Sequence, residues 1–359
     1  MVVAVIAVLV VVLASIYLIQ HGQESKVHKP KARSRQWAGV RKLWTLLIRR
    51  AITGGSLFRI ILGYCQCVSV VRRYLRVHWP SSFISFLETL DLMTFELFDL
   101  VPVECALNRR LGYTIELVAT LVTPVALILG LIVLGIVLLP FAKRSCSLRA
   151  LLSWLPLWDL AFLVLLIQFP TISRKTMVVF DCVEYEDISL LRSDPTVPCY
   201  DVRWFGWAVA AISGAAMYCI GLPLGTWLLS RRLHSANPMS RRLVQALTRS
   251  YREPCWYMES VDLMRKFTLT GVIMLISPQT KAQLWFGVVV NQLCILLHLR
   301  LTPYRDRLCN IVQLAAHVQL FFTYLTAMLF FDEDLASVDS EGIGQHQWIG
   351  VLMICANCG

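Results

Sequence analysis

The chain has 359 residues, of which 57% are hydrophobic and only 16% are charged. A soluble protein of this length has no use for so much apolar surface, and the composition therefore excludes an ordinary soluble domain. The net charge of +11 comes from Lys and Arg clusters that match no nucleic-acid-binding module, so we expect no nucleic-acid partner. The expected fold class is an all-α membrane protein, a multi-pass helical bundle of about eight spans plus a truncated ninth.

The first 54 residues are predicted to form an anchor and a linker. Residues 1–20 are apolar and long enough to span a bilayer. A cleaved signal peptide is the alternative, but the segment lacks a basic n-region and a small-residue cleavage motif before His21, which favours a retained transmembrane anchor. Residues 21–54 are basic and are expected in the cytoplasm, which places the N-terminus outside the cell.

Residues 55–114 are expected to contain one span and one interfacial helix. The alternation of sides requires a crossing in this region, and GSLFRIILGYCQCVSVV at 55–71 is the best candidate. Three arginines at 72, 73 and 76 then fall on the outer side, so a crossing elsewhere is the alternative. We place 81–103, where acids alternate with apolar residues, outside as an interfacial amphipathic helix.

Residues 115–331 are predicted to be the helical transmembrane core. Apolar windows lie at 114–140, 151–170, 204–229, 266–276, 284–301 and 311–331. Basic loops at 142–149, 230–243 and 299–307 alternate with acidic loops at 180–201 and 331–341. The positive-inside rule assigns the basic loops to the cytoplasm and the acidic loops to the exterior, and the expected location is the plasma membrane.

The C-terminal residues 332–359 are expected to form an acidic outer loop and a truncated final span. The segment 346–359 begins like another span and stops after too few residues to cross, as in an incomplete gene product. Its CANC motif at 355–358 has redox or metal spacing but neither a second pair nor a nearby His, so no metal site is expected.

Two cysteines of the acidic loop at 180–201 are predicted to form a disulfide. Cys182 and Cys199 are separated by 16 residues, and an oxidising exterior would let them pair. Two free thiols are the alternative, and Cys105, also expected outside, could compete for either partner.

Four charged residues begin the apolar segment WYMESVDLMRKFTLTGVIML at 256–275. They are Glu259, Asp262, Arg265 and Lys266. All four fall within about a third of the helix circumference, and Asp262 precedes Arg265 and Lys266 by three and four residues, the favourable order for pairing. Two interpretations remain: the basic residues snorkel to the interface, or the four form a buried, internally paired cluster facing other helices. The second accounts better for the two acids, and such a cluster is suited to shift in gating.

Further polar residues lie within the last predicted spans, and each is a candidate for pore lining or for interhelical hydrogen bonding. They are Asn291, Gln292, His298, Gln313 and His317. Gln313 and His317 are four residues apart and therefore share one helix face. For each residue singly, interhelical bonding without an ion pathway is the favoured interpretation.

Several segments, taken in order, resemble a known family. They are FDCVEYEDISLLRSDPTVPCY, MYCIGLPLGTWLL, LTRSYREPCWYMESVDLMRKFTLTG and LTPYRDRLCNIVQ. Their order and spacing resemble the C-terminal transmembrane region of TRP-like proteins of fungi, algae and other protists, which often follows a cysteine-rich, EGF-like or ephrin-receptor-like ectodomain. The resemblance extends over nearly the whole chain beyond residue 40, although no ectodomain precedes the first span. It implies a channel-like or receptor-like helical domain loosely related to cation channels, without identifying a permeant ion.

No motif in the sequence predicts an enzyme. The sequence contains no H-E-x-x-H, P-loop, G-x-S-x-G or G-x-G-x-x-G pattern, and we expect neither catalysis nor a cofactor. Two function classes remain: a cation channel-like or sensor protein, and a non-conducting receptor or scaffold that anchors and oligomerises. The expected partners are the lipid bilayer, further copies of the chain and, for a channel, a small permeant ion.

Overall fold

The computed structural model describes residues 55–71, 112–144, 157–185, 188–233, 248–276 and 280–329, with the single positions 77, 79, 83, 84, 87, 88 and 331. Several predicted features lie outside the described residues. They are the anchor at 1–20, the linker at 21–54, most of the interfacial helix at 81–103, Cys105 and the segment 332–359.

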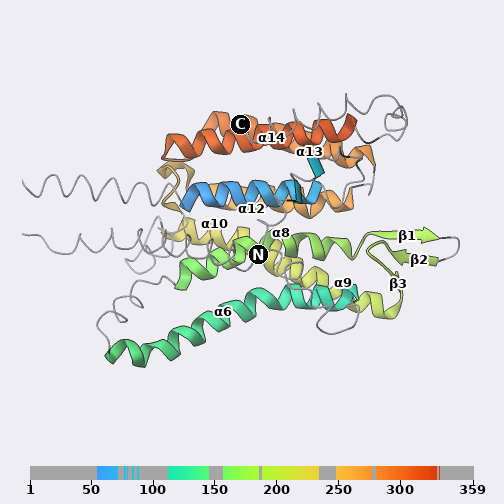
Figure 1. The fold of residues 1–359 in the computed structure, drawn as a ribbon, viewed down its shortest axis with the longest axis horizontal. Helices are drawn as coiled ribbons and strands as arrows, with labels where there is room; N and C mark the ends of the chain where they lie inside the picture. The colour runs from blue at the N-terminus through green and yellow to red at the C-terminus, as the bar shows by residue number, and fades with distance from the viewer. Residues whose placement is uncertain are drawn as a thin grey trace, which may run out of the picture.

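The described chain is a bundle of elongated helices that carries a small sheet at one end (Figure 1). The helices are Gly55–Val71, α6 (Tyr113–Arg144), α8 (Leu157–Val178), α9 (Val202–Gly214), α10 (Gly221–Leu233), α12 (Met258–Thr270), α13 (Lys281–Leu301) and α14 (Arg307–Leu329). The short turns are η3 (Ala215–Ile220), which joins α9 to α10, η4 (Glu253–Cys255) and η5 (Val272–Leu275).

Five of the described helices are long and apolar enough to cross a membrane. They are Tyr113–Val133, Ala161–Val178, Val202–Arg232, Lys281–Leu301 and Arg307–Met328. The helix Gly55–Val71 is apolar but shorter. Large apolar side chains face outward on these helices, for example Val122 at 52% exposure and Leu293 at 60%. This surface fits an integral membrane protein, while the predicted count of about eight spans is not confirmed in the described residues.

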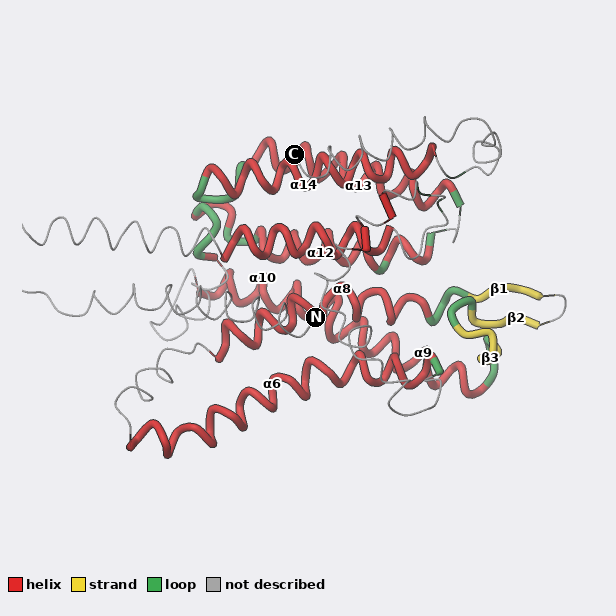
Figure 2. Tube along the Cα trace, in the orientation of Figure 1, coloured by secondary structure: helices red, strands yellow, loops and turns green. Residues whose placement is uncertain are grey.

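Contacts between distant segments define two ends of the bundle (Figure 2). At the sheet end, the backbone N–H of Tyr113 donates to Asp194 Oδ2 at 3.0 Å, so α6 begins beside the sheet. At the other end, Ser56 Oγ lies 2.6 Å from Ser250 Oγ, and Tyr251 forms a backbone bridge with Tyr304. We call this second end the basic end, because the arginines at 231, 232, 252, 300, 305 and 307 lie in its segments. The helix Gly55–Val71 therefore starts at the basic end.

The small sheet corrects the all-α prediction. Strands β1 (Cys182–Tyr185), β2 (Ile188–Leu191) and β3 (Asp194–Pro198) form an antiparallel sheet in the order β1-β2-β3. The predicted disulfide between Cys182 and Cys199 is present, with the two Cα atoms 6.3 Å apart. The segment is too short and polar for a span, and its β-branched residues pair across tight turns once the disulfide joins its ends.

The turn between α9 and α10 is a π-helix. The N–H of Gly221 bonds to the carbonyl of Ala216, five residues back, instead of the four of an α-helix. Pro223 follows directly, and a proline within a helix lacks the N–H for the usual bond. The wider turn thus precedes the proline in one continuous membrane-length helix.

The main core lies where Gly55–Val71, α8, η3, η5, α13 and α14 meet. Its most buried side chains include Cys67, Ile172, Leu269, Leu284 and Tyr324, each at most 1% exposed. The aromatic ring of Tyr324 packs against the backbone of α13 at Gly287, where any Cβ would overlap the ring. This packing holds α13 against α14 and fixes the polar side chains that both helices carry toward the basic end.

Candidate functional site

The start of α12 orients the predicted charge cluster. The turn η4 carries Pro254 near its start, where the missing N–H has no helical partner to lose, and α12 then runs from Met258 to Thr270. Glu259 lies in the first turn, where a negative charge interacts favourably with the helix dipole. The acids and the bases consequently follow each other along one face that points into the bundle.

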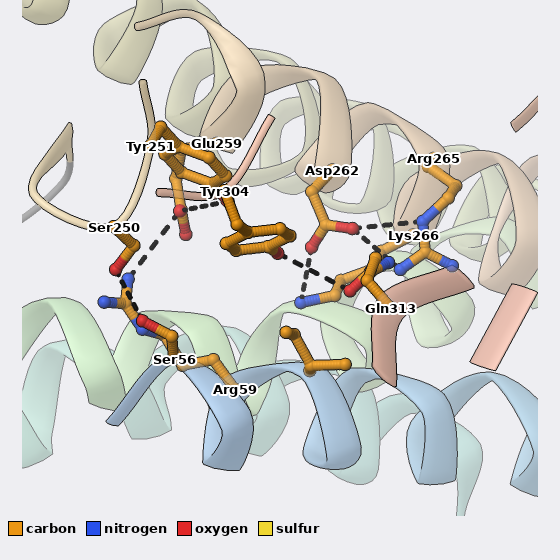
Figure 3. A pocket seen from close by; sticks show the side chains of 11 residues that line it. Ser56, Arg59, Ser250, Tyr251, Glu259, Asp262, Arg265, Lys266, Tyr304 and Gln313 are labelled. Atoms are coloured by element: carbon orange, nitrogen blue, oxygen red, sulfur yellow. Dashed lines mark hydrogen bonds and ion pairs between the residues drawn. The ribbon is translucent and has the colours of Figure 1, made fainter. Parts of the chain in front are cut away.

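Asp262 is paired with two cations of its own helix (Figure 3). Arg265 donates to Asp262 Oδ1 from Nη2 at 2.7 Å and from Nε at 3.0 Å. Lys266 Nζ lies 3.0 Å from the other carboxylate oxygen. Lys266 is only 5% exposed, so its ammonium does not extend to water. The geometry is that of the internally paired alternative, since a snorkelling lysine would expose its end.

Lys266 also contacts a second helix. A Cβ placed on Gly63 would lie 2.7 Å from Lys266 Cε and 3.0 Å from its Nζ, so the lysine passes directly over the backbone of Gly55–Val71. Glycine at this position is therefore required by the close approach of a side chain from α12.

Glu259 connects three segments at the basic end. Its Oε2 accepts a hydrogen bond from Tyr251 at 3.0 Å and lies 3.6 Å from Arg59 Nη1. The Glu259 side chain is 8% exposed and that of Arg59 is 26% exposed, so the arginine lies at the rim. Glu259 thus joins α12 to the preceding loop and to the helix Gly55–Val71.

Tyr251 and Tyr304 close the cluster from the loop side. Their rings are 4.9 Å apart between centroids. Burial raises the pKa of Tyr251 well above its usual value, and the negative charge of Glu259 adds to this rise. Burial, followed by the charge of Asp262, likewise raises the pKa of Tyr304. Both phenols therefore stay protonated at neutral pH and act as hydrogen-bond donors.

Three of the polar residues predicted in the last spans join this cluster. The Tyr304 hydroxyl lies 3.5 Å from Gln313 Oε1, and Gln313 Nε2 lies 3.0 Å from His317 Nε2. His298 Nε2 donates to the carbonyl of Asn310 at 2.9 Å, and its ring centroid is 5.8 Å from that of His317. The shared face expected for Gln313 and His317 therefore points toward α12 and the tyrosines.

The other two predicted polar residues lie apart from the cluster. Asn291 is fully buried, but its Nδ2 bonds to the carbonyl of Gly287 within α13. Gln292 is exposed on the outer face of α13. The prediction that Gln292 lines a pore or bonds between helices is therefore not supported by the single chain, because neighbouring helical positions point about 100° apart.

Two small cavities flank the cluster, and both are lined by Tyr251, Asp262, Arg265, Tyr304 and Gln313. The first has a volume of about 20 Å³ and reaches Ser56, Arg59 and Lys266. The second has a volume of about 30 Å³ and reaches Cys294, His298 and His317. Each cavity is large enough for a water molecule, and polar walls of this kind favour its occupation. Asp262 thus lies between two spaces that water can fill.

Sequence reasoning missed several members of the cluster. Arg59 is a single charge within a predicted span, which by itself marks a functional candidate. Tyr251, Tyr304, Ser56 and Ser250 gave no such signal, because their proximity depends on contacts between segments up to 194 residues apart. The loops at 248–257 and 302–306 therefore contribute as much to the site as the helices do.

Among the residues that the structure describes, no group of three or more His, Cys, Asp or Glu side chains is arranged to hold a metal ion. Comparison of the chain with family models, curated proteins and solved structures finds no match in any of the three.

Proposed function

We propose that the chain is a TRP-like membrane protein whose helical bundle acts as a cation channel-like or sensor domain. The observation that carries this proposal is the position of Asp262 between Arg265 and Lys266, with a water-sized cavity on either side. In this proposal the charge cluster of Glu259, Asp262, Arg265 and Lys266 is the element that changes its pairing when the protein responds.

A cluster of this kind is costly for a bundle that only anchors. Each buried charge loses its hydration, and the loss is offset only while every partner is in place. Arg59 and Lys266 bring cations from two helices to the same small space, beside two carboxylates. Exchange of partners between such neighbours gives two arrangements of similar charge balance, as a gated or sensing domain requires.

The resemblance to TRP-like proteins supports the same proposal. The four resembling segments form the sheet, the η3–α10 region, the start of α12 and the loop that leads into α14. Two of them supply Tyr251, Glu259, Asp262, Tyr304 and Gln313 to the cluster. The resembling motifs thus meet at the site, although they are far apart in sequence.

A non-conducting receptor or scaffold is the second candidate. Only 17% of the α6 window is buried within the chain, and Val125, Leu129 and Ile136 on this helix are each at least 45% exposed. Such a surface suits contact with lipid or with another copy of the chain. In this alternative the charge cluster only fixes the relative position of the helices.

Ion flux in liposomes that contain the purified full chain distinguishes the two candidates. We expect flux of K⁺, Na⁺ or Ca²⁺ above that of empty liposomes, with Cl⁻ less permeant, and a changed flux in Asp262→Asn. The matched control is Gln292→Ala, because Gln292 is polar and exposed on α13 away from the cluster. Correctly folded protein that passes none of these cations under voltage, stretch or ligand stimuli would support the scaffold.

A further inference from the structure

A cluster of two tryptophans and an arginine lies at the basic end between α10 and α12. The guanidinium carbon of Arg231 lies 5.3 Å from the centroid of the Trp227 ring. The Trp227 ring in turn lies 6.3 Å from that of Trp256, which precedes α12. Tryptophan is enriched where a membrane protein meets the headgroup region, because its ring is apolar and its N–H is polar.

Two arginines of this cluster present their charge outward. Arg231 and Arg232 are both exposed in the last turn of α10. The printed contact of Arg231 is the neutral Trp227 ring, and within the described segments neither arginine forms an ion pair with a carboxylate. This part of the surface therefore offers two adjacent guanidinium groups, which bind phosphate oxygens in a planar, bidentate manner.

An apolar stripe leads along the same helix to the two arginines. Ile220, Leu224 and Leu228 are 54%, 50% and 42% exposed and follow one another at intervals of four residues. From Ile220 to Arg232 the rise along the helix is roughly 18 Å, comparable with one leaflet of the hydrocarbon core. The stripe and its charged end have the shape of one lipid molecule: an acyl chain followed by a headgroup.

We propose that this stripe and the Trp227–Arg231–Trp256 cluster bind one anionic phospholipid. The phosphate and the negatively charged headgroup contact Arg231 and Arg232, the two tryptophan rings lie at headgroup level, and an acyl chain lies along Ile220, Leu224 and Leu228. A zwitterionic lipid would leave the two arginines with only one phosphate charge and a competing cation, so the site discriminates by headgroup charge. The proposal holds for a channel and for a scaffold alike.

The site also adjoins the contact between α10 and α12. Thr226, next to Trp227, shares a 2.8 Å hydrogen bond with Ser260 of α12, and both hydroxyls are buried. A lipid that contacts Trp227 on α10 and Trp256 before α12 would hold the two helices together at this point. Binding is therefore expected to raise the melting temperature of the protein, since a ligand that binds only the folded state stabilises it.

The test uses the full chain in an uncharged detergent, titrated with phosphatidylglycerol or with phosphatidylcholine of the same acyl chains. Native mass spectrometry gives the affinity, and the melting temperature gives the stabilisation. We expect tighter binding of phosphatidylglycerol, with a loss of about fivefold in affinity for each arginine removed in Arg231→Gln and Arg232→Gln. Trp227→Leu should weaken binding of both lipids.

Arg203→Gln is the matched control, because Arg203 is also exposed but lies at the sheet end of the same continuous helix. It should leave the preference for phosphatidylglycerol unchanged. Equal binding of the two lipids by the original chain, or an undiminished preference in the double variant Arg231→Gln/Arg232→Gln, would overturn the proposal. Equal stabilisation by inorganic phosphate would also overturn it, since recognition would then need no lipid.

Discussion

A Cβ on Gly63 would lie within 2.7 Å of Cε of Lys266, so a lysine of α12 occupies the space beside a glycine of another helix. The close approach keeps the Lys266 ammonium beside Asp262, and its position depends on the shape of the neighbouring backbone as well as on charge.

Replacement of this glycine tests the contact. Gly63→Ala should lower the melting temperature in detergent, although alanine is favoured over glycine in a helix interior by about 1 kcal/mol. The reason is that the new methyl group displaces Lys266 from Asp262. In a Lys266→Ala background the same change should be neutral or stabilising, and a double-mutant cycle measures the difference. Gly130→Ala, where the added Cβ meets nothing within 4 Å, is the control and should not destabilise.

Removal of the central acid tests the pairing itself. Asp262→Asn leaves Arg265 and Lys266 without a counter-ion, and loss of one partner of a buried pair typically costs about 3–5 kcal/mol. We expect a lower melting temperature or loss of expression, and partial recovery in Asp262→Arg/Arg265→Asp. Glu184→Gln, on an exposed strand position, serves as control. If Asp262→Asn has the stability of the original chain, the cluster does not hold α12 in place.

The carboxylate of Asp194 predicts a dependence on pH at the sheet end. The hydrogen bond from the Thr196 hydroxyl lowers the pKa of Asp194; burial opposes this, and the Tyr113 N–H lowers it further. Because the folded-state pKa is below that of the unfolded chain, the carboxylate contributes stability above the usual Asp pKa and loses it as pH falls through the folded-state pKa. Asp194→Asn should therefore lower the melting temperature at pH 7 by the equivalent of about 1 kcal/mol, and less at pH 3.

The control for this measurement is Asp201→Asn. Asp201 precedes α9 but makes no side-chain capping bond. Its replacement should have the same small effect at both pH values. A loss of stability in Asp194→Asn that does not vary between pH 7 and pH 3 would show that the carboxylate charge is not responsible.

The two ends of the bundle predict opposite sides of the membrane. A cysteine at position 232, at the basic end, should react with an impermeant maleimide only after permeabilisation, and a cysteine at position 203 should react in intact cells. The prediction follows from the basic residues near position 232 and the acidic loop before position 203. Labelling of both positions from the same side would contradict the assigned orientation. Linked Cys182 and Cys199 peptides in non-reduced mass spectra would support an exterior sheet end.

Local rules predicted the parts of the fold that depend on neighbouring residues. Hydropathy found the membrane-length helices, and the spacing of Asp262, Arg265 and Lys266 was sufficient to expect their pairing. The sheet at 182–198 was missed, because its short strands lie in a loop whose charge dominated the interpretation. The contacts of Arg59 and Tyr304 could not be predicted either, since they depend on how separate helices pack.

The π-helix between α9 and α10 sets the rotational phase of everything that follows it. Its wider turn accommodates residues that an α-helix would distribute differently, and each residue in an α-helix corresponds to a rotation of about 100°. Deleting one residue from Ala215–Ile220 would therefore turn the face of α10 about its axis without moving its path. Thr226 would then leave Ser260 and point elsewhere. The length of this turn acts as a gear tooth, and families of such chains should tolerate substitutions within it far better than insertions or deletions.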